Sequence, residues 1–74
     1  MRIFKLLLSE KRNYYCLDGI YKKVIKAENR DLAYDKSLKV ILNFFPNFNG
    51  YDKDMIFWFD NKKIALWING IEEI

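Results

Sequence analysis

Residues 55–68 limit the possible folds of this chain more than any other segment, because a hairpin made from them is apolar on both faces. Side chains along a strand point alternately to opposite sides of a sheet. The first side holds Met55, Phe57 and Phe59, and the second holds Ile56 and Trp58. The sequence offers one clear amphipathic helix, and one helix covers one face of a sheet. The second apolar face is therefore expected to lack cover.

The length of the turn in this hairpin decides how its second half is distributed between the faces. A turn of two residues, or of four over residues 60–63, places Ile64, Leu66 and Ile68 on the first face. A turn of three residues would reverse the assignment. With any even length, Ala65 and Trp67 join Ile56 and Trp58 on the second face.

Four residues of the second face form the candidate partner-binding site: Ile56, Trp58, Ala65 and Trp67. Trp58 is expected nearly opposite Ala65, with Trp67 across from Ile56. Each tryptophan can bury roughly 150 to 250 Å². The patch therefore reaches the size at which exposed apolar surface marks an interface. The alternative is that residues 69–74 or the hydrophobic N-terminal strand fold back and cover it.

The helix is predicted between Asn29 and Pro46. Asn29 can accept a hydrogen bond from the first helical turn, Asp31 suits the positive end of the helix dipole, and Pro46 ends the run. Apolar and small side chains recur at helical spacing between these signals. The predicted buried face holds Ala33, Tyr34, Ser37, Leu38, Val40, Ile41, Leu42, Phe44 and Phe45.

Strands are predicted before the helix. Residues 2–9 form the first, and residues 10–13 form a polar turn. Residues 14–17 and 20–27 are predicted to be strands joined at Asp18 and Gly19, a strong two-residue hairpin signal. A helix beginning at Asp18 is the competing interpretation.

Beyond the helix, residues 47–54 are predicted to be a loop that turns at Asn49 and Gly50, and Asn69 and Gly70 end the C-terminal hairpin. Residues 1–74 make one small domain, which at this size buries only about 60% of the surface of its unfolded chain. The expected fold is α+β with two layers, an antiparallel sheet of four to five strands with one amphipathic helix on one face. The expected order is β-β-α-β-β.

Charge is unevenly distributed along the chain. Residues 1–30 carry eight basic and three acidic side chains, a net of +5, whereas the whole chain has a net charge of +3. Nucleic-acid binding is therefore the alternative function, with phosphates held by Lys22, Lys23, Lys26 and Arg30. Bases would stack on an aromatic side chain such as Tyr14, Tyr15 or Tyr21.

Catalytic and metal-binding residue types are scarce. The chain has no histidine, threonine or glutamine, which excludes histidine-based nucleophilic pairs and histidine-bound metals within one chain. Cys16 has no histidine to activate it and is expected to be a half-buried small side chain. Asp52, Asp54 and Asp60 could form a carboxylate pair or a weak divalent-metal site. In residues 47–54, however, the glycine comes too early for a calcium loop and no glutamate closes it, so we expect a solvated loop. We expect no enzyme and no cofactor.

The longest apolar run is far shorter than the roughly 18 residues that cross a bilayer, and the N-terminus lacks the pattern of a signal peptide. The single cysteine, Cys16, excludes an internal disulfide and fits a reducing cytoplasm. These features predict a cytoplasmic protein without a membrane partner.

The runs VIKAEN (residues 24–29) and DLAYDKSL (residues 31–38), followed by a hairpin that contains DNKK and closes on Trp67, resemble small phage-encoded anti-CRISPR proteins. The resemblance implies one helix on an antiparallel sheet. It also implies a stoichiometric inhibitor bound to a host defence protein or nucleoprotein complex in the host cytoplasm. A homodimer that buries the patch is a third interpretation.

Overall fold

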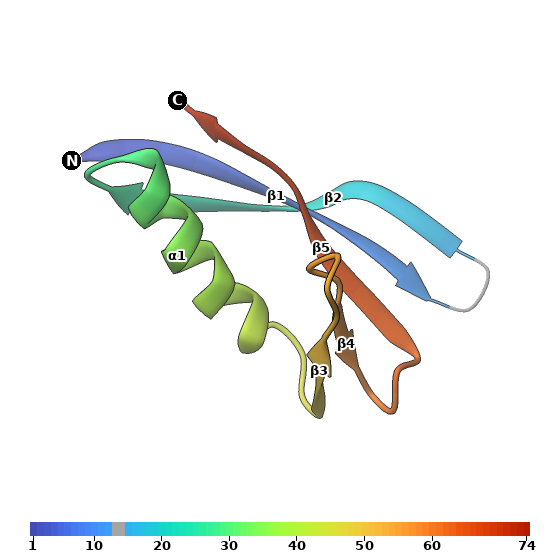
Figure 1. Ribbon diagram of the computed structural model, residues 1–74. Coiled ribbons are helices and arrows are strands. Elements are labelled where there is room, and N and C mark those ends of the chain that lie inside the picture. Colours follow the sequence, from blue (N-terminus) through green and yellow to red (C-terminus); the bar gives the residue numbers. More distant parts are fainter. Residues whose placement is uncertain (13–14) are drawn as a thin grey trace.

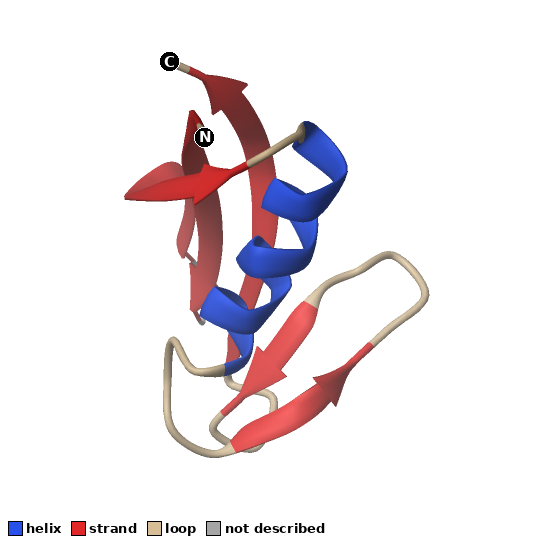
Figure 2. Ribbon diagram, turned by 90° about the vertical axis from the view of Figure 1, so that its left-hand side faces the viewer, coloured by secondary structure: helices blue, strands red, loops and turns tan. Residues whose placement is uncertain are grey.

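The computed structural model describes residues 1–12 and 15–74 and contains five strands and one helix. In chain order the elements are β1 (Arg2–Arg12), β2 (Tyr15–Ala27), α1 (Arg30–Leu42), β3 (Phe48–Tyr51), β4 (Phe57–Phe59) and β5 (Ile64–Glu73). The strands form one antiparallel sheet in the order β2-β1-β5-β4-β3. The helix lies against one face of this sheet, beside the long strands (Figures 1 and 2).

The α+β class and the antiparallel sheet with one helix are confirmed, and the sheet has five strands. The order contains one strand more than predicted, because β3 lies within the expected loop of residues 47–54. Phe48 and Tyr51 explain the extra pairing. Their rings lie 5.4 Å from those of Phe59 and Phe57, respectively. Such cross-strand aromatic pairs stabilise a short strand that Asn49 and Gly50 would otherwise disfavour.

The predicted hairpin turn at Asp18 and Gly19 is wrong, because β2 continues through both residues. In the ladder with β1, Leu8 pairs with Tyr21 and Glu10 pairs with Leu17, so the three residues between them face Ser9 alone. Gly19 adopts a φ of 59° there, and its backbone N–H donates to the Ser9 Oγ at 2.8 Å. The glycine thus serves a bulge, which needs the same left-handed conformation as a turn.

The polar turn predicted over residues 10–13 is wrong for its first three residues, which belong to β1; Asn13 and Tyr14 lie outside the described residues. Glu10 is only 4% exposed. Its carboxylate accepts hydrogen bonds from Arg12 Nε at 2.9 Å and from the Tyr21 hydroxyl at 2.7 Å. These two donors compensate for the loss of water, which is why a glutamate can lie inside the sheet.

The C-terminal hairpin does not end at Asn69 and Gly70 as predicted. In the ladder with β1, Leu7 pairs with Gly70 and Leu8 pairs with Ile68, so Asn69 is a one-residue bulge and β5 continues to Glu73. The segment expected to fold back over the tryptophans is therefore a strand paired in the sheet. Glu73 forms an ion pair with Arg2, which ties the two ends of the described chain together.

The N-terminal signal of the helix is confirmed. Asn29 has an extended backbone, and its side-chain oxygen accepts from the backbone N–H of Leu32 at 2.9 Å. The helix ends at Leu42, earlier than predicted from Pro46. The Phe44 N–H donates to the Ile41 carbonyl at 3.0 Å. This bond spans three residues instead of the four of an α-helix, as is common at the end of a helix.

The core lies between α1 and the covered face of the sheet. Buried side chains come from every element except β3: Phe4, Leu6, Leu8, Ile25, Ala27, Ala33, Ile41, Phe57, Phe59, Leu66 and Ile71. Two residues predicted for the buried helix face, Tyr34 and Leu42, are exposed. Phe44 and Phe45 lie beyond the helix, and the Phe45 ring packs 5.6 Å from that of Phe59. They extend the cover of the core toward the short strands.

Replacing Asn29 with alanine should lower the free energy of unfolding by about 1 kcal/mol, because the first helical turn loses its side-chain acceptor. Urea unfolding followed by circular dichroism measures the loss. Asn29→Asp retains an acceptor and should keep most of the stability. Equal losses for both variants would contradict a capping role for Asn29.

Replacing Tyr21 with phenylalanine should cost about 1 to 2 kcal/mol, because the buried Glu10 carboxylate loses one of the three hydrogen bonds that it accepts while the ring is kept. Chemical denaturation measures the change. The matched control is Tyr15→Phe, since Tyr15 is 68% exposed. An unchanged stability of Tyr21→Phe would show that the carboxylate does not depend on this bond.

Candidate functional site

The hairpin of β4 and β5 has a four-residue turn, which confirms the predicted assignment of faces. Phe57 pairs with Leu66, Phe59 pairs with Ile64, and Trp58 pairs with Ala65. Phe57, Phe59 and Leu66 are buried in the core. Trp58 and Ala65 therefore lie on the face of the sheet that α1 does not cover.

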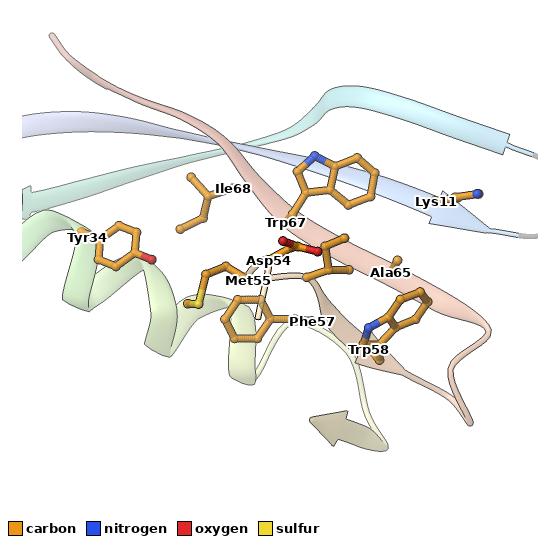
Figure 3. Close-up of a pocket in the computed structure, with 10 residues that line it drawn as sticks. Lys11, Tyr34, Asp54, Met55, Phe57, Trp58, Ala65, Trp67 and Ile68 are labelled. Carbon is orange, nitrogen blue, oxygen red and sulfur yellow. The ribbon is translucent and has the colours of Figure 1, made fainter. Parts of the chain in front are cut away.

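The four residues of the predicted site all line one groove with a volume of about 490 Å³, which we call the tryptophan groove. Figure 3 shows the two indoles on either side of Ala65, with Trp67 on β5 and Trp58 on β4. Ile56 lies in the chain just before β4 rather than inside the strand. The face predicted from alternation is thus a concave surface made by two neighbouring strands and the segment that leads into them.

The two indoles are partly exposed in the single chain, whereas Ala65 is only 3% exposed. Ala65 forms the floor between Trp58 and Trp67. Because it is buried, it shapes the groove and offers little surface for the predicted contact with a partner. Neither segment expected to cover the patch does so. β1 and the last residues of β5 pair with each other beside it in the sheet.

The sequence did not predict the remaining walls of the groove. Within the described residues, β4 pairs with β5 only as far as Leu66, although β5 continues to Glu73. The groove opens where β4 ends and reaches across to the helix (Figure 3). Further lining residues are Lys11, Tyr34, Asp54, Met55, Phe57 and Ile68. Tyr34 was predicted to lie on the buried helix face. Its hydroxyl group, which needs a hydrogen-bond partner when buried, was the one feature of the sequence that indicated partial exposure to solvent.

Asp52 organises the segment that forms one wall of the groove. Its carboxylate accepts from the backbone N–H groups of Asp54 at 2.9 Å and Ile56 at 3.1 Å, and from Trp58 Nε1 at 3.4 Å. These bonds, led by that from Ile56, lower the pKa of Asp52. The wall also contains Met55 in a left-handed backbone conformation, with a φ of 61°. The Asp52 side chain thus links its own loop to the Trp58 indole.

A second, smaller hollow of about 260 Å³ adjoins the groove, and we call it the lysine hollow. It is lined by Lys11, Trp58, Lys62, Lys63 and Ala65. All three lysines are exposed, and none forms an ion pair with a residue of the described ranges 1–12 and 15–74. The site therefore combines an apolar groove with unneutralised positive charge.

The structure does not bring together the four basic residues predicted to bind nucleic acid. Lys22 and Lys26 pair with Leu7 and Ile3 and lie on the helix-free face. Lys23 lies on the other face, with its Nζ 5.7 Å from the ring centre of Phe44. Arg30 is the first residue of α1. Two of the four thus share a face with the tryptophans.

Of the side chains considered for catalysis or metal binding, Asp54 lines the groove, and Cys16, Asp52 and Asp60 do not. Cys16, expected to be half-buried, is exposed on β2, and Asp52 is engaged by the hydrogen bonds of its own loop. Among the described residues there is no group of three potential metal ligands. In the same ranges, no helix has the length and apolar character needed to cross a membrane. The arrangement offers shape, apolar surface and charge.

A scan against protein-family models, a search of curated proteins and a search of solved structures each found no match to this chain.

Acidification should weaken the support that Asp52 gives to the groove. A carboxyl group whose pKa is lowered by folding contributes stability above its unfolded-state pKa of about 3.9, and this contribution is lost as the pH falls through the lowered value. Asp52→Asn keeps an acceptor oxygen for the two backbone N–H groups but not for Trp58 Nε1, and it does not titrate. The variant should be less stable than the parent at neutral pH, and the difference should shrink below about pH 4.

Urea unfolding at a series of pH values, followed by tryptophan fluorescence, measures this difference. Both tryptophans of the chain line the groove, so the signal reports on this site. A stability difference that stays constant from neutral to acidic pH would contradict a charged role for Asp52.

Proposed function

We propose that this protein is a small non-enzymatic binding module that docks on a protein partner through the tryptophan groove. The observation that supports this proposal most is the convergence of Ile56, Trp58, Ala65 and Trp67 on one groove that the rest of the described chain leaves open. Tryptophan, tyrosine and arginine dominate the energetic centres of protein interfaces. A groove with two tryptophans and Tyr34 has this composition.

The dimensions of the groove support docking of a side chain from a partner. A volume of about 490 Å³ falls within the range of pockets that hold ligands or anchor residues. Its walls are mostly apolar, so burial of an apolar anchor releases water from both surfaces. Asp54 and Lys11 at the walls can orient that anchor.

An inhibitor is the specific form of this proposal. The resemblance to phage anti-CRISPR proteins supports a partner that is a host defence protein or nucleoprotein complex in the cytoplasm. A module without catalytic groups acts by occupying a surface, in a fixed ratio to its target. The fold supports such a role because the groove lies on β4 and β5, each of which is paired with a strand along both of its edges.

Nucleic-acid binding is the second candidate, favoured by one observation. Lys22 and Lys26 share the helix-free face with the two tryptophans. Phosphate binding by these lysines would show a steep dependence on salt. A second copy of the chain seated on the groove is the third candidate.

Trp58→Ser and Trp67→Ser should each abolish binding of the partner while the domain still unfolds cooperatively, because both side chains are partly exposed. The parent and each variant are immobilised and used to capture proteins from a lysate of cells that encode the chain, and the captured proteins are identified by mass spectrometry. Tyr15→Ser, an exposed aromatic on β2, is the matched control and should capture the same protein as the parent.

A partner retained by both tryptophan variants would contradict docking through the groove. Unfolding of the domain by each substitution would show that the tryptophans are core residues, which also contradicts the proposal. Light scattering gives the size of the free protein. A dimer that becomes a monomer in both tryptophan variants would replace the docking proposal with a homodimer interface.

A further inference from the structure

We propose that the tryptophan groove and the lysine hollow together bind an acidic protein segment, in which an apolar anchor residue is followed by carboxylates. This inference rests on the proposed docking function and names the chemistry of the partner. The two sites share Lys11, Trp58 and Ala65, so they are parts of one surface. A ligand that fills one of them necessarily approaches the other.

The lysine hollow provides the charge complementarity. Lys11 comes from β1, and Lys62 and Lys63 come from the turn between β4 and β5, so strands that are not neighbours in the chain converge here. Within residues 1–12 and 15–74, no acidic side chain lines the hollow. Asp60 belongs to the same turn, but it is not part of the lining. Three positive charges beside an indole suit carboxylates that follow an apolar side chain.

The groove provides the place for the anchor and sets its direction. In Figure 3, Tyr34 and Ile68 lie at one end of the groove and Lys11 at the other, with Met55 and Asp54 between them. The apolar side chain is placed between Met55 and Ile68, which both line the groove. The carboxylates of the same segment then extend past Trp58 toward the lysines.

The position of Asp54 favours an acidic protein segment over nucleic acid. A nucleic-acid strand carries a charge at every phosphate, so a strand lying along the groove would place phosphates near Asp54 and near the ionised Asp52. A protein segment can be neutral there and acidic only at the lysine end. The indoles of the groove are also partly buried, whereas base stacking needs open ring faces.

The turn that carries the lysines is held in a costly conformation. Asp60, Asn61 and Lys62 have φ values of 53°, 57° and 64°, a left-handed run that L residues rarely adopt. The turn is anchored by the Lys62 N–H, which donates to Asn49 Oδ1 at 3.1 Å, and by the Asp60 N–H, which donates to the Asn47 carbonyl at 3.0 Å. Glycine would fit this position better than lysine, so Lys62 lowers the stability of the turn.

The test uses the full chain as bait for a displayed library of short random peptides. The enriched peptides are expected to contain a large apolar residue followed by Asp or Glu. Synthetic peptides of the enriched sequence are then titrated at low and high salt, with tryptophan fluorescence as the readout. Binding should weaken as salt is raised, because the carboxylates and lysines are solvent-exposed.

Substitutions assign the charge contribution to the hollow. Lys62→Gly and Lys63→Ala should each weaken peptide binding roughly twofold to fivefold. Lys62→Gly should leave the unfolding midpoint unchanged or raise it, because glycine relieves the left-handed strain. Lys22→Ala removes the same charge from the helix-free face outside the hollow, and binding of the peptide should stay within about twofold of the parent.

Three results would overturn the inference. Enriched peptides without acidic residues, whose binding is lost in Trp58→Ser, would leave the docking function intact but remove its acidic partner. Tighter binding of a single-stranded oligonucleotide than of any enriched peptide, with loss in the lysine variants, would assign the surface to nucleic acid. Enriched peptides that bind Trp58→Ser and Trp67→Ser as well as the parent would remove the docking function itself.

Discussion

The sheet has apolar side chains on both faces, and the single helix can shield only one of them from water. One helix of 13 residues lies against a sheet of five strands, and it shields only one face. The chain extends that cover with Phe44 and Phe45, which pack beyond the end of the helix against Tyr21 and Phe59. On the opposite face the C-terminal hairpin carries two partly exposed tryptophans.

The groove owes its shape to strands of unequal length. β4 has three residues and β5 has ten, so β5 continues beyond its neighbour and leaves a recess that loop residues 52–56 and the helix enclose. Two bulges lie opposite the middle of β1, one at Asn69 on β5 and one around Gly19 on β2. They interrupt the two ladders that β1 forms with these strands. Such bulges increase the local twist of a sheet, which Figure 1 shows as a sharp crossing of the long strands.

The sequence predicted the features that depend on a single residue's hydrogen bonding or on the alternation of side chains between the two faces of a strand. Asn29 caps the helix, and an even turn places Trp58 beside Ala65. Predictions failed where tertiary contacts decide between conformations that a residue can adopt equally well. Gly19 provides a left-handed backbone for a turn or for a bulge, and the Ser9 hydroxyl across the ladder makes it a bulge. Glu10 was expected in a turn because it is a charged residue. The side chains that allow its burial, Arg12 and Tyr21, come close to it only in the folded sheet. The lysine hollow was missed for the same reason, since Lys11 is distant in sequence from Lys62.

Acrylamide quenching of the native protein's fluorescence measures whether the helix-free face is covered, because both tryptophans lie on that face. The sample must first be shown to be monomeric by light scattering. For open indoles we expect quenching between that of a free tryptophan derivative and that of a buried indole, with a single unfolding transition that raises it to the free value. A monomer whose fluorescence acrylamide does not quench would show that its indoles are already covered within the single chain, and the tryptophan groove would then not be an open site.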